Sequence, residues 1–305
     1  MKLSVDFPSV IGREGPAKVR EFAAAVEEIG YDDIAVYDHV VMGHPAPGRA
    51  AGPYPAAMPI LEAVVLMATI AAVTDRVTIS SEVLVLPQRS PVLTAKQIST
   101  IDTLSGGRVR LGVGVGWQES EYDALGFDFS TRGRRMDVAI DTLRAYWRDE
   151  SVDVVSADTN SVAMAMEPKP PQGAGLPIWF GGASPSAFQR VADRGDGWMA
   201  IPGRDDDHTR SMIDEIRRRT EEAGRDPDAL GWQIGLATPP SKDGGGKRFY
   251  ADHDAARRRA AVSKELGFGW LAVNATAVFQ AGARSVDALI EALRGLHEAI
   301  HQEVG

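Results

Sequence analysis

Short apolar runs alternate with longer segments of mixed polarity along nearly the whole chain. In the longer segments apolar side chains recur every three or four positions, as they do on one face of a helix. We expect strands at residues 2–7, 33–37, 77–86, 108–115, 177–182, 197–201, 232–237 and 270–273. We expect helices at residues 16–29, 60–72, 91–104, 119–125, 136–147, 184–194, 205–223, 252–266 and 286–300.

Eight predicted strands that alternate with helices over 305 residues indicate an α/β fold, a (β/α)8 TIM barrel with loop insertions. The alternative is an open doubly wound sheet, which usually has fewer strands or a second domain at this length. No internal repeat divides the sequence, so we expect a single domain over residues 1–305. Two segments lack a period: the Pro- and Gly-rich loop at 40–58 and an irregular insertion at about 149–176.

Residues at the ends of two predicted helices carry further information. Pro16 and Gly30 bracket the first helix, in the positions that a helix start and a helix end favour. In contrast, Arg132, Arg134 and Arg135 lie at the start of a helix, where the helix dipole disfavours positive charge. We therefore expect these arginines to bind partners elsewhere in the fold.

A glycine-rich strand end from Leu104 to Trp117, LSGGRVRLGVGVGW, is the strongest single feature. Glycines at 112, 114 and 116 remove side chains where a strand ends, so that a flat ring or a phosphate can approach the main chain. Two alternatives remain: a dinucleotide-binding turn, whose glycine spacing differs from this one, and a strand packed closely against a neighbour.

Composition narrows the class of function. The formal net charge is −9 and the sequence pI is about 5.2, which disfavours binding to nucleic acid or to an anionic membrane. The chain has no cysteine, which excludes disulfides, thiolate metal sites and cysteine nucleophiles and suits a reducing cytoplasm. No apolar stretch approaches membrane-spanning length. We expect a cytoplasmic protein that acts on small molecules.

Candidate chemistry lies where strands end, because functional groups of a parallel barrel gather at the carboxyl ends of its strands. Asp38 and His39 follow the second strand, and a histidine titrates near neutral pH, which suits acid–base work. The alternative role for His39 is structural, capping the loop. Residues 181–184 join a strand to a helix whose first turn exposes unpaired N–H groups, which favours an anion site or a plain Ser184 cap.

Three other sequence features resemble known motifs without completing them or are absent. His297, Glu298 and His301 form an H-E-x-x-H pattern, but only four residues follow them and no later ligand can complete a zinc site, so we expect no metal. The GGGK sequence at 244–247 lacks the other residues of a phosphate-binding loop. No serine lies in a G-x-S-x-G nucleophile motif.

Three segments together resemble the luciferase-like monooxygenase superfamily, and more narrowly its coenzyme F420-dependent oxidoreductase branch. They are DIAVYDHV at 33–40, the long stretch SSEVLVLPQRSPVLTAKQISTIDTLSGGRVRLGVGVGW at 80–117, and PIWFGGASPSAFQRVADRGDGW at 177–198. The resemblance covers most of residues 1–200 and implies a barrel with insertions. It also implies a flavin or deazaflavin ring across the carboxyl ends of the strands, with its phosphate held by main chain.

The resemblance assigns roles to particular positions. It places Asp38 and His39 near the reactive carbon of the ring, as candidate catalytic and coenzyme-binding residues. It places a non-prolyl cis peptide that supports the ring at Glu82 and Val83, although small or polar residues are more usual than glutamate there. The remaining coenzyme-binding candidates lie beside the ring or at its phosphate: Val115, Gly116, Trp117, Ser120, Gly181, Gly182 and Ala183.

The resemblance implies coenzyme F420 as cofactor, with FMN as the alternative. F420 carries an acidic tail, for which Arg49, Arg89, Lys169 and Arg204 are candidate partners. We expect hydride exchange between the deazaflavin and a small organic substrate held under the 40–58 loop, by a homodimer. The alternatives are an FMN-dependent monooxygenase served by a separate reductase and a coenzyme-binding protein without catalytic activity.

Overall fold

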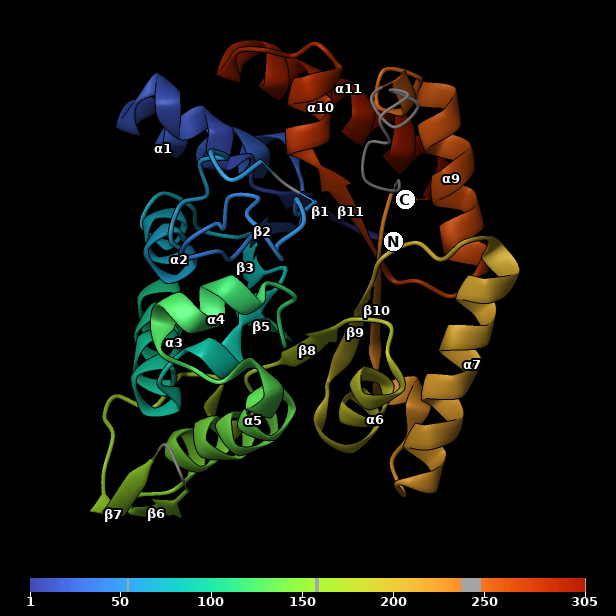
Figure 1. Ribbon diagram of the computed structural model, residues 1–305. Coiled ribbons are helices and arrows are strands. Elements are labelled where there is room, and N and C mark those ends of the chain that lie inside the picture. The colour runs from blue at the N-terminus through green and yellow to red at the C-terminus, as the bar shows by residue number, and fades with distance from the viewer. Residues whose placement is uncertain (54, 157–158, 237–247, 305) are drawn as a thin grey trace.

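Eight parallel strands close into a barrel in the computed structural model, which describes residues 1–53, 55–156, 159–236 and 248–304 (Figure 1). Each strand pairs with the next along the chain, and the last pairs with the first, so the sheet has no edge. This confirms the predicted barrel and excludes the open sheet. The barrel strands are β1 (Lys2–Asp6), β2 (Asp33–Val36), β3 (Thr78–Ser81), β5 (Val109–Gly114), β8 (Ile178–Gly181), β9 (Gly197–Ala200), β10 (Gly231–Gly235) and β11 (Trp270–Asn274).

Helices cover the outside of the barrel (Figure 1). They are α1 (Pro16–Ile29), α2 (Ala63–Ala71), α3 (Pro91–Ser105), α5 (Arg132–Arg148), α6 (Pro185–Arg194), α7 (Asp206–Glu222), α9 (His253–Glu265) and α11 (Val286–Val304). Two short helices, α4 (Glu119–Leu125) and α10 (Ala275–Ala281), follow β5 and β11, and the second was not predicted. Among the helices described, none combines the length and the apolar character that a bilayer crossing needs.

Two helix starts differ from the prediction. Helix α5 begins at Arg132 rather than at residue 136. Of its first-turn arginines, Arg135 binds other segments, as expected, whereas Arg132 donates to the carbonyl of the adjacent Phe129. Arg135 Nε donates to the Pro87 carbonyl at 2.8 Å and its guanidinium lies 4.2 Å from the ring of Phe127. Helix α2 begins at Ala63 rather than at residue 60, because the Glu62 carboxylate caps it by accepting from the Val65 N–H at 2.8 Å.

The predicted third strand is broken in the middle. After β3 comes a cis peptide between Glu82 and Val83, as the resemblance implies, and then a two-residue strand β4 (Leu84–Val85) that pairs with β5. A 3-10 turn at Leu86–Gln88 completes the segment. The sequence pattern concealed this break, because apolar residues that favour strands occur on both sides of it and the strand residues next to it are buried.

The glycines of the predicted ring-binding strand accommodate the protein's own side chains. A Cβ atom added to Gly112 would lie 1.9 Å from the Ser81 carbonyl oxygen, and one added to Gly114 would lie 2.4 Å from Val83 Cγ2. Gly116 adopts a φ of +70°, and its added Cβ would lie 2.6 Å from Val85 Cγ1. The packing therefore favours the close-approach alternative for this motif: the glycines receive the broken third strand.

The barrel interior contains a layered polar core. Arg110 of β5 lies 4.4 Å from the ring of Trp179 and 4.3 Å from the ring of Trp270. Its Nη2 donates to Asp33 Oδ2 at 2.9 Å and to Gln233 Oε1 at 2.8 Å. A buried charge is tolerated only when it is paired and hydrogen-bonded. The partners of Arg110 therefore fix how these side chains are arranged inside the barrel.

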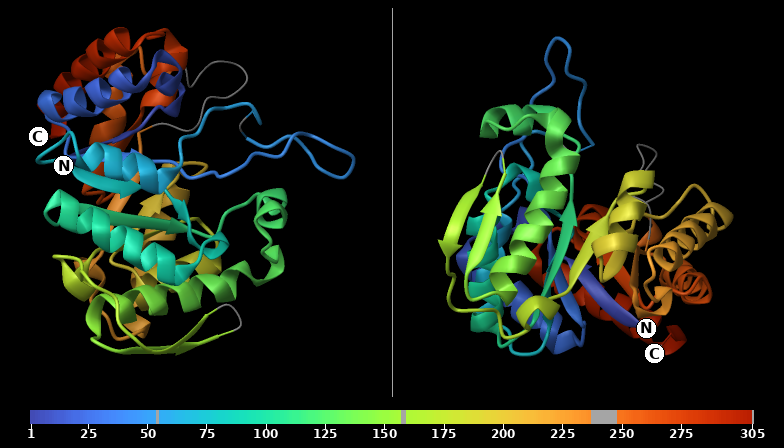
Figure 2. Two further views of the ribbon diagram at one scale, coloured as in Figure 1. Left: turned by 90° about the vertical axis from the view of Figure 1, so that its left-hand side faces the viewer. Right: turned by 90° about the horizontal axis from the view of Figure 1, so that it is seen from below.

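The irregular segment after α5 carries a small antiparallel hairpin, made of β6 (Val152–Val155) and β7 (Asn160–Met164), outside the barrel (Figure 1). The first view of Figure 2 shows the loop of residues 40–53 and α4 projecting from one end of the barrel, while both termini lie at the other end. The strands run toward the loop and α4, so this end carries their carboxyl termini and is called the mouth below.

Candidate functional site

A histidine–carboxylate pair joins the two elements that project at the mouth. His39 follows β2, and its Nδ1 lies 3.0 Å from Oε2 of Glu121 in α4. Both side chains are almost fully buried. Since an ionised Glu121 requires a donor here, Nδ1 carries the hydrogen and Nε2 is the basic nitrogen of the neutral ring. This is the arrangement of a histidine whose orientation and tautomer are set by an acid.

Glu121 also fixes the start of the 40–58 loop. Its Oε1 accepts from the Val40 N–H at 2.5 Å and the Val41 N–H at 3.3 Å. Burial raises the pKa of Glu121, but the hydrogen bonds from His39 and from the two main-chain N–H groups outweigh this and leave its pKa below the usual value. Glu121 is therefore ionised at neutral pH and stabilises a positive charge on His39.

Trp117 lies beside this pair at the mouth. It is 43% exposed, and its ring stands edge-on to the His39 ring at a centroid distance of 5.5 Å. The loop closes over the indole at Gly52, where an added Cβ would lie 2.6 Å from Trp117 Cη2. A flat apolar surface next to a histidine suits a bound planar ligand or substrate.

Asp38, predicted beside His39, faces a different partner. Its carboxylate accepts from Arg89 Nη2 at 2.6 Å, from Arg89 Nε at 3.2 Å and from the Val85 N–H at 2.9 Å. Arg89 in turn forms an ion pair with Glu62 at 2.8 Å. The Asp38 carboxylate thus ties the end of β2 to the broken third strand.

The cis peptide places Glu82 and Val83 at the mouth. The Val83 side chain fills the space beside Gly114 and Gly181, so it forms part of the surface on which a ring would lie. Gln233 Nε2 donates to Glu82 Oε2 at 2.5 Å, and the Glu82 carboxyl also contacts the carboxyl of Asp6. Glu82 as a residue is partly exposed at the mouth while its carboxyl lies among interior side chains.

The carboxyl groups of Asp6 and Glu82 have unusual proton affinity. Burial raises the pKa of Asp6 to about 7, against the opposing effects of the hydrogen bonds from Tyr37 and Glu82. Burial and the nearby charge of Asp6 raise the pKa of Glu82 well above its usual value, and Arg110 offsets only part of this. Two adjacent buried carboxyls cannot both ionise readily at neutral pH.

The turn predicted to bind a phosphate is exposed, and its backbone conformation requires a glycine. Gly182 adopts a φ of +107°, and residues 182–184 are exposed at the start of α6. Ser184 accepts from the Ala187 N–H at 3.2 Å and Pro185 takes the first helical position, as predicted. The N-terminus of this ten-residue helix is open to an anion on the mouth side.

The other predicted residues flank the Trp117 segment. Val115 and Gly116 are partly exposed, and the Val115 carbonyl accepts from the Tyr122 hydroxyl at 2.7 Å. Ser120 Oγ is buried and has no hydrogen-bond partner among the described residues. An orphaned hydroxyl at this position suits a ligand that supplies a partner.

Two of the four candidate basic residues are engaged elsewhere. Arg89 is bound to Asp38 and Glu62, and Lys169 Nζ donates to the carbonyls of Tyr146 and Asp149. Arg49, in the loop over the mouth, donates to the His44 carbonyl, and Arg204, which follows β9, is exposed beside Asp205. Arg49 and Arg204 are the two candidates on the mouth side.

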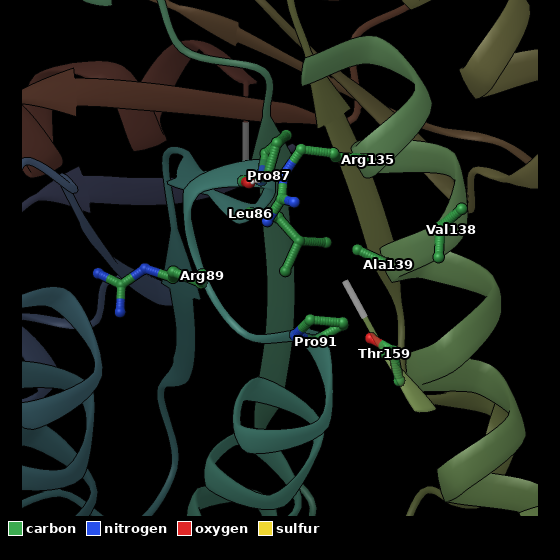
Figure 3. Close-up of a pocket in the computed structure, with 8 residues that line it drawn as sticks. All are labelled: Leu86, Pro87, Arg89, Pro91, Arg135, Val138, Ala139 and Thr159. Atoms are coloured by element: carbon green, nitrogen blue, oxygen red, sulfur yellow. Dashed lines mark hydrogen bonds between the residues drawn. The ribbon is translucent and has the colours of Figure 1, made fainter. Parts of the chain in front are cut away.

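Two cavities lie away from the mouth. Figure 3 shows the smaller, about 10 Å³, between α5 and the segment that follows β4, with Arg135, Pro87 and Thr159 among its lining residues. It has room for roughly one water molecule. The larger, about 590 Å³, is an open groove on the outer face of α2 and α3.

The H-E-x-x-H pattern has a structural role, and the GGGK sequence lies outside the described residues. His297 stands edge-on to Tyr31 at 4.9 Å and stacks on His301 at 5.6 Å, on the last helix, α11. The GGGK sequence and most of the 235–240 strand end fall within residues 237–247, outside the described residues.

Sequence reasoning missed part of the site. Glu121 and Gln118 were assigned no role, although Gln118 also binds the loop, through the Gly43 N–H and the Val41 carbonyl. Asp6 lies within the first predicted strand and was assigned no role either. The available signal was a polar residue in an apolar strand: Asp6, Arg110 and Gln233 each interrupt a buried run.

Fold and mouth together define a (β/α)8 barrel protein with titratable side chains gathered at the carboxyl ends of its strands. The chain belongs to the luciferase-like monooxygenase family, whose sequence model matches residues 2–294. An uncharacterised protein of Mycobacterium tuberculosis is 33% identical over 211 residues, 67% of this chain and 71% of that protein. An F420-dependent glucose-6-phosphate dehydrogenase of Kribbella flavida is 26% identical over 232 residues, 74% of this chain and 65% of that protein.

Solved structures share the fold at low identity. An F420-dependent secondary alcohol dehydrogenase in complex with an F420–acetone adduct superposes with a TM-score of 0.77 and 18% identity, covering 98% of this chain and 99% of that one. The oxygenating constituent of 3,6-diketocamphane monooxygenase from Pseudomonas putida, in complex with FMN, superposes with a TM-score of 0.75 and 15% identity, covering 100% and 99%. Both cofactors therefore occur on this fold.

Proposed function

We propose that the protein is an F420-dependent oxidoreductase that exchanges a hydride between the deazaflavin and a small organic substrate at the mouth of the barrel. The observation that carries the proposal is the His39–Glu121 pair beside the exposed ring of Trp117. It joins a proton-handling group to a flat binding surface. Similarity to an F420-dependent glucose-6-phosphate dehydrogenase over 74% of the chain supports this cofactor.

Side chains and main chain at the mouth fit such a coenzyme. Val83, supported by the glycines at 114 and 181, forms an apolar surface for a ring. The orphaned Ser120 hydroxyl offers a hydrogen bond. The exposed turn at 182–184 offers main-chain N–H groups to a phosphate, and Arg49 and Arg204 are on the side where an acidic tail would extend.

When bound, the deazaflavin supplies an obligate hydride carrier. The chain's own groups then have two tasks, orientation and proton management. His39 Nε2 accepts or donates the proton of the substrate heteroatom, and Glu121 stabilises the imidazolium that forms. The loop at 40–53, tied to Glu121 and Gln118, excludes water from the substrate.

Single-turnover oxidation of bound reduced F420 against ketones, imines and activated alkenes tests the proposal. We expect one substrate class to oxidise the coenzyme. His39→Ala should lower that rate roughly 10²-fold or more, while coenzyme affinity stays within a few fold, because general acid–base catalysis typically contributes that much. An unchanged rate would remove His39 from the mechanism, and no oxidation by any substrate would favour a binding protein without catalytic activity.

An FMN-dependent monooxygenase is the second candidate, favoured by the family and by the FMN-bound structure that shares the fold. It would need a separate reductase to supply reduced flavin. Comparing the affinity of the apo-protein for F420 and for FMN separates the two. Micromolar or tighter binding of FMN without binding of F420 would select the monooxygenase.

We further propose that the protein is a homodimer that pairs through the groove on α2 and α3. Apolar side chains of α2 lie on both its inner and its outer face, and Val65 is 67% exposed. The groove is lined mainly by Val64, Val65, Ala68, Ala72, Val73 and Ile101. A helix that is apolar all round is usually covered on both sides.

A further inference from the structure

The floor of the mouth contains two buried carboxyl groups, of Asp6 and Glu82, that the His39 chemistry does not use. Asp6, the last residue of β1, is 6% exposed, and its Oδ2 accepts from the Tyr37 hydroxyl at 2.7 Å. Its Oδ1 is buried and has no donor among the described residues. The carboxyl group in hydrogen-bond contact with Asp6 is that of Glu82, which has no hydrogen to donate when ionised.

A hydrogen on one of the two carboxyls removes this conflict. If one of them carries it, the two carboxyls become a donor and an acceptor, and Asp6 Oδ1 gains a hydrogen-bond partner. The surrounding elements reinforce this state. Gln233 of β10 donates to Glu82 Oε2, and Asn274 of β11 donates to the Tyr37 hydroxyl at 3.0 Å, which orients that hydroxyl toward Asp6.

Charged and titratable groups around the pair come from β2 and its end, from β5 and from the segment before α9. Tyr37 and Asp33 face it from β2 and its end, and Arg110 faces it from β5. Tyr250 lies near through Asn274, whose N–H donates to its hydroxyl at 3.2 Å. Arg110 is already neutralised by Asp33 at 2.9 Å, so it cannot balance two further negative charges.

We propose that Asp6 and Glu82 hold one proton between them at neutral pH and that this proton controls the binding of an anionic, electron-rich ring at the mouth. With the proton in place the pair carries one negative charge; without it the pair carries two, at the strand ends that border the mouth. The second half of the proposal rests on the proposed function, because it takes the ring to be that of an acidic deazaflavin coenzyme.

Two substitutions test the shared proton without changing the shape of the pair. In Glu82→Gln the amide N–H can donate permanently to Asp6 Oδ1, and in Asp6→Asn the new amide can donate to Glu82. Both variants should fold, as judged by circular dichroism. Infrared difference spectra of the coenzyme-free protein in light and heavy water then report protonated carboxyl groups. We expect the wild-type protein to show one such group at neutral pH, which deprotonates as the pH is raised and which neither variant shows.

Absence of a protonated carboxyl in the wild-type protein at pH 6, or its persistence in both variants, would overturn the shared proton. This readout needs no coenzyme, so it stands even if the proposed function fails. Glu119→Gln, a substitution of an exposed carboxylate in α4, is the matched control and should leave the infrared titration unchanged.

Coenzyme binding tests the second half. Between pH 6 and pH 8.5 the dissociation constant of F420 should rise roughly tenfold for the wild-type protein, because one linked proton changes it by up to tenfold per pH unit. For Glu82→Gln it should stay within about twofold. An equal pH dependence in both proteins would overturn the control by the pair, whereas no F420 binding at any pH would overturn the proposed function.

Discussion

His39 and Glu121 act as one unit although 81 residues of chain separate them. Nδ1 of the imidazole meets the Glu121 carboxylate, which sets the tautomer of the ring, and in the proposed function the imidazole handles the proton. Glu121→Gln tests this division of roles, since glutamine can still accept from the Val40 and Val41 N–H groups but brings no charge. We expect kcat to fall roughly 10²-fold and its acidic limb to move to lower pH.

Glu119→Gln is the control for that substitution, because Glu119 is exposed on the same helix and should leave kcat unchanged. A wild-type pH profile in Glu121→Gln would show that Glu121 serves only to hold the loop.

Gly116 separates backbone strain from steric overlap. Gly116→Ala places a side chain on a backbone with positive φ and brings its Cβ within 2.6 Å of Val85. Gly126→Ala also places a side chain on a backbone with positive φ, +78°, but no atom lies within 4 Å of the new Cβ. We expect urea denaturation to show that Gly126→Ala lowers the free energy of unfolding by about 1–2 kcal/mol. Gly116→Ala should lose about 1–3 kcal/mol more. Equal losses would mean that the contact with Val85 relaxes freely.

At the scale of helices and strands, the carboxylate of Glu27 links α1 to the segment that precedes β3. Buried Glu27 accepts from the N–H groups of Asp75, Arg76 and Val77 at 2.6–3.1 Å. Burial raises the pKa of Glu27, but the three main-chain donors outweigh this and lower its pKa. Its stabilising effect is therefore present above the unfolded pKa, about 4.3, and is lost as the pH falls through the lower folded value.

Glu27→Gln should lower the free energy of unfolding at pH 7 by about 1–3 kcal/mol, the range for hydrogen bonds to charged groups. The difference from the wild-type protein should shrink below about pH 4. Glu28→Gln, at the exposed neighbouring position, should have little effect at either pH. A difference that persists at low pH would assign the effect to shape rather than to charge.

Local rules explain which boundaries the sequence could reveal. Pro16, Gly30 and Ser184 with Pro185 mark helix ends by chemistry that acts within one turn, and the structure has those ends. The start of α5 was missed because its arginines oppose the helix dipole, and the contacts of Arg135 with Pro87 and Phe127 that offset this come from other segments.

For the chain as a unit, barrel closure could be predicted because strand number and alternation are properties of the sequence pattern. The contacts between side chains at the floor of the mouth could not be predicted from the sequence. The floor joins β1, β3, β5 and β10, and the pairing of Asp6 with Glu82 and of Glu82 with Gln233 depends on the closed register. Coenzyme contacts at the predicted residues remain a prediction.

The proposed homodimer can be tested by a substitution in the groove of α2 and α3. Val65→Arg should convert the proposed dimer to a monomer in sedimentation analysis, because it places a charge in the apolar groove of α2 and α3. Val155→Arg alters an equally exposed valine of the β6–β7 hairpin and should leave the dimer intact. If only Val155→Arg dissociates the dimer, the hairpin is the interface.

Equilibrium titration of the apo-protein with F420, with FMN as competitor, tests the central claim most directly. The account predicts saturable binding of F420 at micromolar concentration or tighter, weakened by substitutions at the mouth such as Trp117→Ala and unaffected by His39→Ala beyond a few fold. Failure of F420 to bind, or binding that Trp117→Ala leaves unchanged, would contradict it.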